Sequence, residues 1–212
     1  MAGQVLAAED PLRREEAMDG TPKAVARRLR TVLLAASISS ILATTAQAAP
    51  NACEPEILAA ADRYGVPVGI LYAVGLTETG KKGSLQPNAL NIDGKALFPT
   101  TRQQAVEAFR QARENGAKFI DLGCMQINHR FHSEHFRSVQ DMLDPHRNVD
   151  YAARFLVQLK RKHDTWSMAV ARYHAGPDND PAQKRYICRV IANMVATGFG
   201  NWTSNARDFC SP

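Results

Sequence analysis

The sequence predicts a mostly helical α+β domain with a small β element between its helices. Most of the chain after residue 50 has apolar residues at helical spacing. One stretch instead alternates around a turn signal, which is typical of a hairpin. Hydrophobic residues make up 45% and charged residues 22%, as in ordinary globular domains. This composition argues against a disordered, collagen-like or multi-pass membrane protein.

The first 48 residues have the pattern of a secretory signal peptide. A basic run at 23–30 precedes an uncharged apolar run, Thr31–Ala43, and the small-x-small sequence ending at Ala48 is a cleavage signal. The apolar run is shorter than the ~20 residues that span a bilayer. The alternative to a cleaved signal peptide is an uncleaved N-terminal anchor. Met18 would begin a leader of ordinary length, so we treat residues 1–17 as a mis-annotated start.

Two helices are expected to open the domain, which we assign to residues 49–198. The first lies between Pro55 and Gly65, and the second runs from Pro67 to Gly80, so that Pro marks each opening turn and Gly each end. Their apolar positions are Ile57, Leu58, Ala61 and Tyr64 in the first helix and Ile70, Leu71, Val74 and Thr77 in the second.

A β element of three strands is expected next. Residues 88–98 alternate around Asp93-Gly94, which predicts a hairpin, and residues 119–122 are a third strand candidate. Between them, a capping box opens a helix over 101–116.

Three further helices complete the domain. One follows Asp144-Pro145, one runs from Trp166 toward Gly176 with Trp166 in the core, and the last ends at Gly198. Their inward positions are expected to include Val149, Ala152, Leu156, Val170, Ile187, Val190 and Ile191. Residues 199–212 have no period and are taken as a C-terminal tail.

Without the leader, the chain carries 20 Lys and Arg against 16 Asp and Glu. This mild positive charge suits an anionic polymer, but it is too dispersed to indicate nucleic acid. In an exported chain the four cysteines can be oxidised, and three pairings are open to them. They are Cys53, Cys124, Cys188 and Cys210.

Glu78 is the candidate catalytic residue. It shares a helical face with Leu71 and Val74, and it lies at a helix C-terminus, where the macrodipole disfavours negative charge. Both conditions favour a carboxyl that keeps its proton near neutral pH, which a general acid at a glycosidic bond requires. A solvated Glu at a fraying helix end is the alternative.

Four sequence blocks resemble one known family. They are Glu78-Thr79-Gly80, the Gly-Cys-Met-Gln-Ile-Asn segment at 123–128, Asp144-Pro145 with Asn148, and Ala-Arg-Tyr-His-Ala-Gly at 171–176. In this order they are similar to the motifs of the soluble lytic transglycosylases (SLT domain), which are goose-lysozyme-like. The resemblance spans residues 53–195 and is closest to the small, exported, single-domain members. It implies a lysozyme-like fold.

The resemblance also implies an activity and a site. Such an enzyme cleaves the β-1,4 bond between N-acetylmuramic acid and N-acetylglucosamine without water and leaves 1,6-anhydro ends, with Glu78 as the sole acid/base. Tyr173 would lie near Glu78, and His174 stands where the family more often has Asn. The residues implied to bind the glycan are Thr79, Met125, Gln126, Asn128, Tyr173 and His174.

The resemblance further implies the setting and the partners. It favours the pairing Cys53–Cys124, which leaves Cys188–Cys210. The expected protein is a periplasmic monomer that acts on peptidoglycan strands, without cofactor, metal, nucleic acid or membrane span after cleavage. An envelope-spanning secretion or conjugation machine is the candidate partner.

Several alternatives stay open. A hydrolytic lysozyme would need a second carboxylate. Asp121 is the candidate, because Asp93 fits a turn and Asp144 a helix start. A non-catalytic wall-binding assembly factor would have no need of an acid at Glu78. Zinc binding is not expected, because the histidine spacing spreads the side chains around a helix. Those histidines are His129, His132, His135 and His146.

Overall fold

The computed structural model describes residues 51–81, 83–176 and 179–211, and all of its elements belong to one unit, Gln47–Pro212. The predicted signal peptide lies outside the described residues. The longer helices are α1 (Glu54–Tyr64), α2 (Val68–Thr79), α3 (Arg102–Glu114), α6 (Pro145–His163), α7 (Trp166–Ala175) and α8 (Asp180–Ala196). The shorter elements are α4 (His129–His132), the 3₁₀ turn η1 (Ser133–His135), α5 (Val139–Met142), α9 (Ser204–Cys210), β1 (Leu90–Ile92), β2 (Lys95–Leu97), β3 (Ile120–Leu122) and β4 (Ile127–Asn128).

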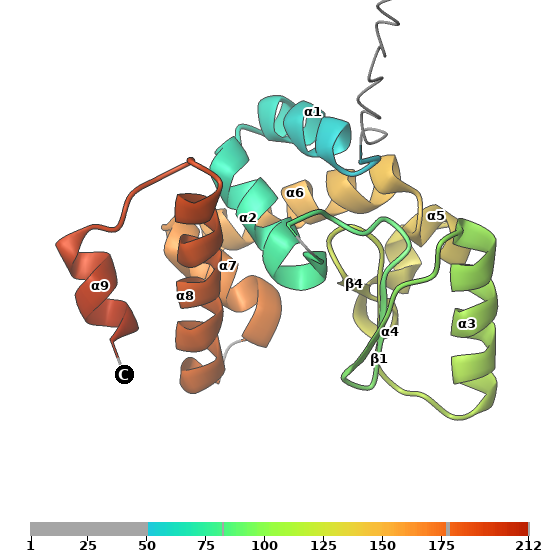
Figure 1. The fold of residues 1–212 in the computed structure, drawn as a ribbon. Coiled ribbons are helices and arrows are strands. Elements are labelled where there is room, and N and C mark those ends of the chain that lie inside the picture. Colours follow the sequence, from blue (N-terminus) through green and yellow to red (C-terminus); the bar gives the residue numbers. More distant parts are fainter. Residues whose placement is uncertain (1–50, 82, 177–178, 212) are drawn as a thin grey trace, which may run out of the picture. The chain divides into compact units, whose positions relative to one another are not determined.

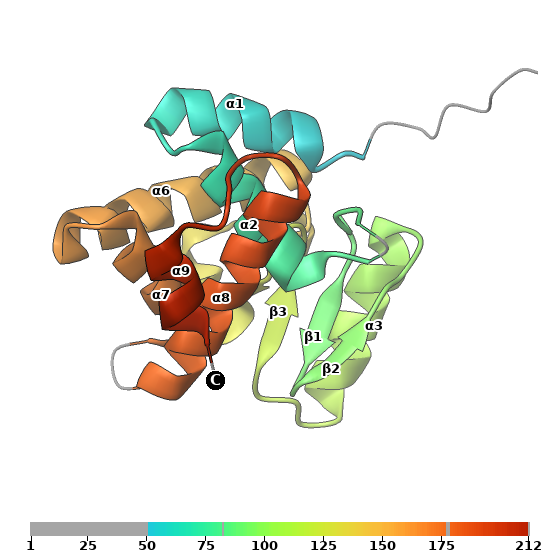
Figure 2. The ribbon, with the colours of Figure 1, turned by 60° about the vertical axis from the view of Figure 1, so that its left-hand side comes forward.

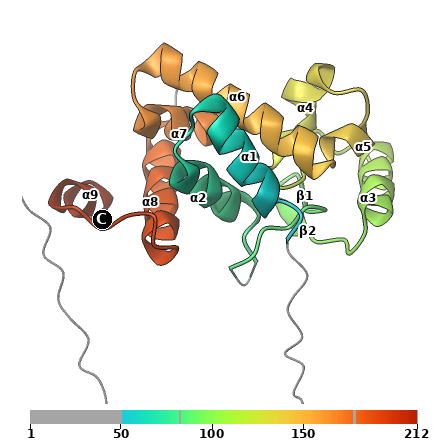
Figure 3. The same ribbon diagram turned by 90° about the horizontal axis from the view of Figure 1, so that it is seen from above.

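The domain has a helical part and a sheet part. In the helical part, α2 packs against α8, α6 packs against α1 and α7, and α7 packs against α8. The sheet part carries α3 on its outer side, as Figures 1 and 2 show. Seen from above, α6 lies along α1 and reaches from α7 to α5 (Figure 3). None of the helices in the described ranges has the length and apolarity needed to cross a membrane.

The predicted hairpin and third strand are confirmed, and the sheet gains a fourth strand. The strand order is β2-β1-β3-β4, with all neighbours antiparallel. Asp93 and Gly94 form the turn with positive φ angles, and the Asp93 carboxylate accepts a hydrogen bond from the Phe119 amide at 2.9 Å. The added strand, β4, has only two residues, which is too short to show alternation.

The predicted helices are present, with two differences in their surfaces and extent. Leu58 is 60% exposed, so the inward face of α1 is narrower than the apolar pattern suggests and consists of Ile57, Ala60 and Ala61. The segment without a period contains α9, which a Thr203 side chain caps. A helix of seven residues packed by a disulfide does not need a periodic apolar face.

The two disulfides join Cys53 to Cys124 and Cys188 to Cys210. This is the pairing that the family resemblance implies. The first bridge ties the start of α1 to the loop between β3 and β4, and both of its cysteines are fully buried. The second bridge ties α9 to α8.

A single buried amide joins the helical part to the same loop. Asn148, in the first turn of α6, is fully buried. Its Nδ2 donates to the carbonyls of Leu122 and Met142, each at 2.8 Å, and its Oδ1 accepts from the Met125 amide at 2.8 Å. Gly123 has φ of 77°, and a Cβ there would lie 2.7 Å from Asn148 Nδ2, so this packing requires glycine.

We predict that Asn148→Ala lowers the free energy of unfolding by about 2–4 kcal/mol. The substitution removes three hydrogen bonds to buried backbone groups, and a buried group left without a partner costs about 1–3 kcal/mol before the structure relaxes. Urea denaturation measures the loss. Gln158→Ala, on an exposed position of the same helix, is the control and should change stability by less than about 0.5 kcal/mol. Equal stability of the two variants would contradict the prediction.

Candidate active site

A cavity of about 640 Å³ lies where the ends of α2 and α7 face the loop and strands of the sheet part. It brings Glu78 together with Gln126, Asn128, Tyr173 and His174, which the sequence predicted as site residues. Its lining residues are Glu78, Asp121, Gln126, Ile127, Asn128, Phe131, His132, Phe155, Arg172, Tyr173, His174, Ala175 and Gly176.

Glu78 lies in the last turn of α2, with its side chain only 14% exposed. Its Oε1 accepts a hydrogen bond from the hydroxyl of Tyr186 at 2.6 Å. The Nδ1 of His174 lies 3.5 Å from the same oxygen. The carboxyl group is therefore held in a fixed orientation at the wall of the cavity.

Tyr186, on α8, is the site residue that sequence reasoning missed. It is fully buried, and its ring stacks on that of His174 with centroids 4.2 Å apart and planes 2° from parallel. Burial and the charge of Glu78 hold its pKa well above the usual 10, so its hydroxyl remains a donor. The inward residues of this part of α8 are Gln183, Tyr186 and Val190. The apolar pattern had favoured Ile187 and Ile191, and a Tyr next to Arg185 gave no such signal.

Tyr173 lines the same cavity as Glu78, but its hydroxyl bonds to the backbone of the loop and not to Glu78. It donates to the carbonyl of Met125 at 2.8 Å. Burial, followed by the nearby charge of Glu78, raises its pKa well above the usual value. Tyr173 thus fixes α7 to the loop between β3 and β4, and Tyr186 rather than Tyr173 orients Glu78.

Thr79 and Met125 were expected to line the glycan groove, and the structure places both below the surface of this cavity. Both are buried, at 3% and 0% exposure, and neither is among the cavity-lining residues. The Thr79 hydroxyl donates to the carbonyls of Gly75 and Cys124, each at 3.1 Å. Met125 packs beneath α2, where a Cβ on Gly75 would lie 3.1 Å from its sulfur. The two residues join α2 to the loop and form the floor below the site.

Gln126 and Asn128 present polar groups to the cavity from fixed positions. Gln126 has a φ of 48°, and its Nε2 donates to the carbonyls of Ala89 and Gly123 at 3.1 and 3.0 Å. A non-glycine residue in the left-handed region is held there by such contacts. Asn128 donates through Nδ2 to Asp121 Oδ1 at 2.6 Å.

Asp121 is the second carboxylate of the cavity. Burial raises its pKa to about 6, and the charge of Glu78 acts in the same direction, while the Asn128 amide and His174 oppose the rise. The other two candidate carboxylates have structural roles, as predicted. Asp93 forms the hairpin turn, and Asp144 caps α6 by accepting from the Arg147 amide.

The histidines that invite a metal interpretation have separate contacts. His132 pairs with the Tyr151 hydroxyl at 2.8 Å, His146 pairs with Glu56 at 2.8 Å, and His129 packs on the ring of Phe109. Burial lowers the pKa of His132 and His129, which keeps them neutral. Within the described ranges no group of three metal-ligating side chains comes together.

The fold and the cavity define a helical domain with a buried glutamate at a helix end, facing a small antiparallel sheet. The family model "Transglycosylase SLT domain" matches residues 55–188, which is more than half of the chain. The chain therefore belongs to the transglycosylase SLT domain family, whose fold is lysozyme-like and whose members are typically lytic transglycosylases. Membership implies peptidoglycan as the substrate. Neither a curated protein nor a solved structure matches the chain significantly.

The raised pKa of Asp121 predicts a pH-dependent stability. Because its pKa rises from the ordinary 3.8 to about 6 on folding, the native state holds a proton between these pH values that the unfolded chain has lost. The resulting stabilisation is complete below pH 3.8 and is lost as the pH rises through 6.

We therefore expect the stability of wild type relative to Asp121→Asn to fall by roughly 2–3 kcal/mol between pH 4 and pH 7.5. Urea unfolding of both proteins across this range measures it. The value at pH 4 is the internal control, because position 121 is then mostly neutral in both folded proteins. A difference that does not vary with pH would contradict the assignment.

Proposed function

We propose that the protein is a peptidoglycan lytic transglycosylase with Glu78 as its general acid and base. The observation that carries the proposal is the pairing of the largely buried Glu78 carboxyl with the fully buried Tyr186 at the wall of a cavity. A carboxyl group held by a donor and shielded from solvent is suited to transferring a proton to a glycosidic oxygen.

The proposed reaction has two steps. Glu78 first protonates the oxygen that leaves with N-acetylglucosamine, while the acetamido oxygen of N-acetylmuramic acid stabilises the positive charge developing at C1. The Glu78 carboxylate then takes the proton of the C6 hydroxyl, whose oxygen bonds to C1. Because nucleophile and electrophile belong to one sugar, proximity favours ring closure over attack by water.

The cavity lining supports a glycan as the ligand. Gln126 and Asn128 offer amide groups on the sheet side, while Phe131, Phe155 and Tyr173 offer aromatic faces. Sugar rings present both hydroxyl groups and apolar C–H faces, so a mixed lining of this kind matches them. Two buried disulfide cysteines and the predicted signal peptide favour action in the periplasm. We propose that the protein acts there as a monomer. An association with an envelope-spanning secretion or conjugation machine is the setting we propose.

Hydrolysis is a second candidate, which the position of Asp121 favours. Asp121 lines the same cavity as Glu78 and is close enough for the two charges to interact. A charged Asp121 on the sheet side could hold a water for attack on C1, as in two-carboxylate glycosidases. We prefer the transglycosylase reaction because one oxygen of Asp121 is already engaged by Asn128 at 2.6 Å.

Product masses separate the two reactions. We expect digests of isolated sacculi to contain muropeptides ending in 1,6-anhydro-N-acetylmuramic acid, with little or no reducing end, because ring closure excludes water. Mass spectrometry distinguishes the ends, which differ by one water. Chitin oligomers, which lack the lactyl-bearing sugar, are the control and should be poor substrates. A dominant reducing-end product that disappears in Asp121→Asn would establish the hydrolase instead.

Variants of the Glu78 pair test the roles of its members. Glu78→Gln should abolish cleavage and leave the fold and glycan binding intact, because Gln cannot donate the proton; this class of catalysis is worth about 10²–10⁴-fold in rate. Tyr186→Phe should lower kcat by about 10-fold with little change in KM, since it removes the hydrogen bond that positions Glu78 and keeps the stacked ring.

Tyr72→Phe is the matched control, because the Tyr72 hydroxyl also donates to a glutamate, Glu54, over a distance of 3.1 Å. Neither of these two residues lines the cavity. It should leave kcat and KM unchanged. If Glu78→Gln cleaves sacculi at the wild-type rate, Glu78 is not the acid. If Tyr186→Phe raises KM and spares kcat, Tyr186 acts in substrate binding and not in positioning Glu78.

A further inference from the structure

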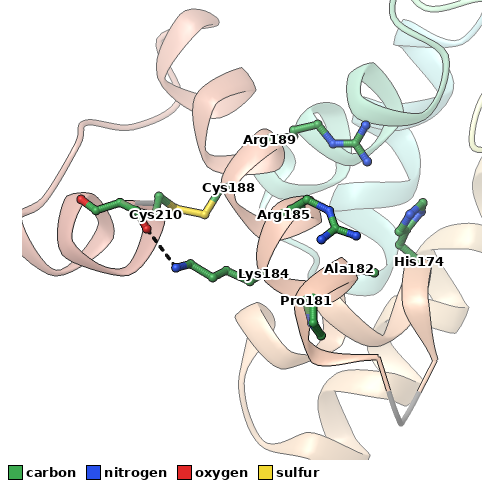
Figure 4. Close-up of a pocket in the computed structure, with 9 residues that line it drawn as sticks. His174, Pro181, Ala182, Lys184, Arg185, Cys188, Arg189 and Cys210 are labelled. Carbon is green, nitrogen blue, oxygen red and sulfur yellow. Dashed lines mark hydrogen bonds between the residues drawn. A yellow bond between two sulfur atoms is a disulfide. The ribbon is translucent and has the colours of Figure 1, made fainter.

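A second cavity, of about 710 Å³, lies against α8 and the C-terminal segment that follows it. Figure 4 shows it between α8, α9 and the end of α7. The Cys188–Cys210 disulfide forms part of its wall. The lining residues are His174, Pro181, Ala182, Lys184, Arg185, Cys188, Arg189, Cys210 and Ser211.

The cavity is basic, and its two arginine side chains lie on the same side of it as His174. Arg185 and Arg189 are four residues apart on α8, and Figure 4 shows both side chains pointing toward His174. Lys184 points the other way, and its Nζ donates to the carbonyl of Ser211 at 2.9 Å. No lining residue of the described chain carries a carboxylate. Arg185 and Arg189 are exposed, and within the described residues neither forms an ion pair.

This basic cavity adjoins the candidate active site. His174 lines both cavities, and its ring nitrogen lies 3.5 Å from the Glu78 carboxylate. The guanidinium of Arg189 lies 5.7 Å from the centre of the Tyr186 ring, which in turn bonds Glu78. An anionic group bound by the arginines would therefore sit one side chain away from the reacting bond.

The chemistry of the substrate places anionic groups at this distance. The sugar whose C1 reacts at Glu78 also carries the stem peptide, through the lactyl group at its O3. That peptide has free carboxylates, and the planar guanidinium fork is the side-chain group that best matches a carboxylate. The stem peptide starts at O3 of the sugar whose C1 reacts at Glu78, so its first residues lie close to the cavity walls beside Glu78.

We propose that Arg185 and Arg189 bind carboxylates of the stem peptide on the muramic acid being cleaved. The inference rests on the proposed function for the position of the sugar. Binding of these carboxylates makes the protein selective for glycan strands that still carry peptides. Arg185 lies within the span that the family model matches, whereas Arg189 and Cys210 lie beyond it.

A binding experiment tests the site without any need for cleavage. Glu78→Gln protein is titrated by calorimetry with N-acetylmuramyl-L-alanyl-D-glutamate and with the same compound after both carboxyl groups are converted to amides. We expect the acid to bind about tenfold more tightly than the amide. Adding Arg185→Gln and Arg189→Gln should remove this preference, and Arg185→Gln alone should remove part of it without touching Tyr186.

The charge-matched control is Arg161→Gln with Lys162→Gln, two exposed positions at the end of α6 that line neither cavity. It should keep the full preference. The dipeptide glutamyl-glutamate, as a probe for acidic protein segments, should bind more weakly than the muramyl compound. If it binds as tightly, the cavity is a general anion surface and the proposal is wrong. A preference that survives the arginine substitutions would also overturn it.

Cleavage assays keep this result separate from the proposed function. Wild type and the arginine double variant are compared on peptide-bearing strands and on strands stripped of peptide by an amidase. The double variant should lose about tenfold in kcat/KM on the first substrate alone. If wild type cleaves neither substrate yet the preference in binding is found, the proposed reaction fails and the carboxylate site stands. If wild type cleaves both equally and the variant behaves the same, the reaction stands and the site fails.

Discussion

The buried amide of Asn148 is the interaction on which the rest of the site depends. Its three hydrogen bonds join α6 to the backbone at Leu122, Met125 and Met142. The loop held in this way contains Cys124, which is bridged to α1, and Gln126, which lines the cavity. A short loop with a positive φ at both Gly123 and Gln126 would not keep one conformation without such partners. The sheet wall of the cavity is therefore held in place by Asn148, in the first turn of α6.

The opposite wall depends on how closely α2 approaches that loop. Gly75 allows Leu85 and Met125 to pack against the helix axis, since a Cβ there would lie 2.7 Å from Leu85. One turn further on, Thr79 bonds the carbonyl of Cys124. These contacts fix the C-terminal end of α2 to the loop. Glu78, which directly precedes Thr79, then faces the cavity. The buried neighbours of Glu78 thus position it, although none of them needs to touch a glycan.

The sequence was sufficient for most of the fold and for part of the site. Long helices have an apolar period, and the Asp93-Gly94 turn and the capping box of α3 are local signals, so these elements could be predicted. Elements of two to seven residues, such as β4 and α9, owe their existence to tertiary contacts and a disulfide. The helical face and helix end made Glu78 only a candidate, and the four sequence blocks that resemble the family singled it out as the catalytic residue. Tyr186 could not be found in this way, because its role depends on α8 crossing α2 more than one hundred residues away.

His174 illustrates how one side chain can connect two parts of the proposed site. Its flat ring stacks on Tyr186, with planes 2° apart, and this contact keeps the tyrosine hydroxyl directed at Glu78. His174 is exposed and lines both the cavity that contains Glu78 and Asp121 and the basic cavity that contains Arg185 and Arg189. An Asn at this position would be too short to stack on the ring or to separate the two cavities. Because the negative and positive groups lie on either side of one imidazole, a substrate with a neutral reacting bond and an anionic branch matches the surface better than an unbranched neutral glycan does.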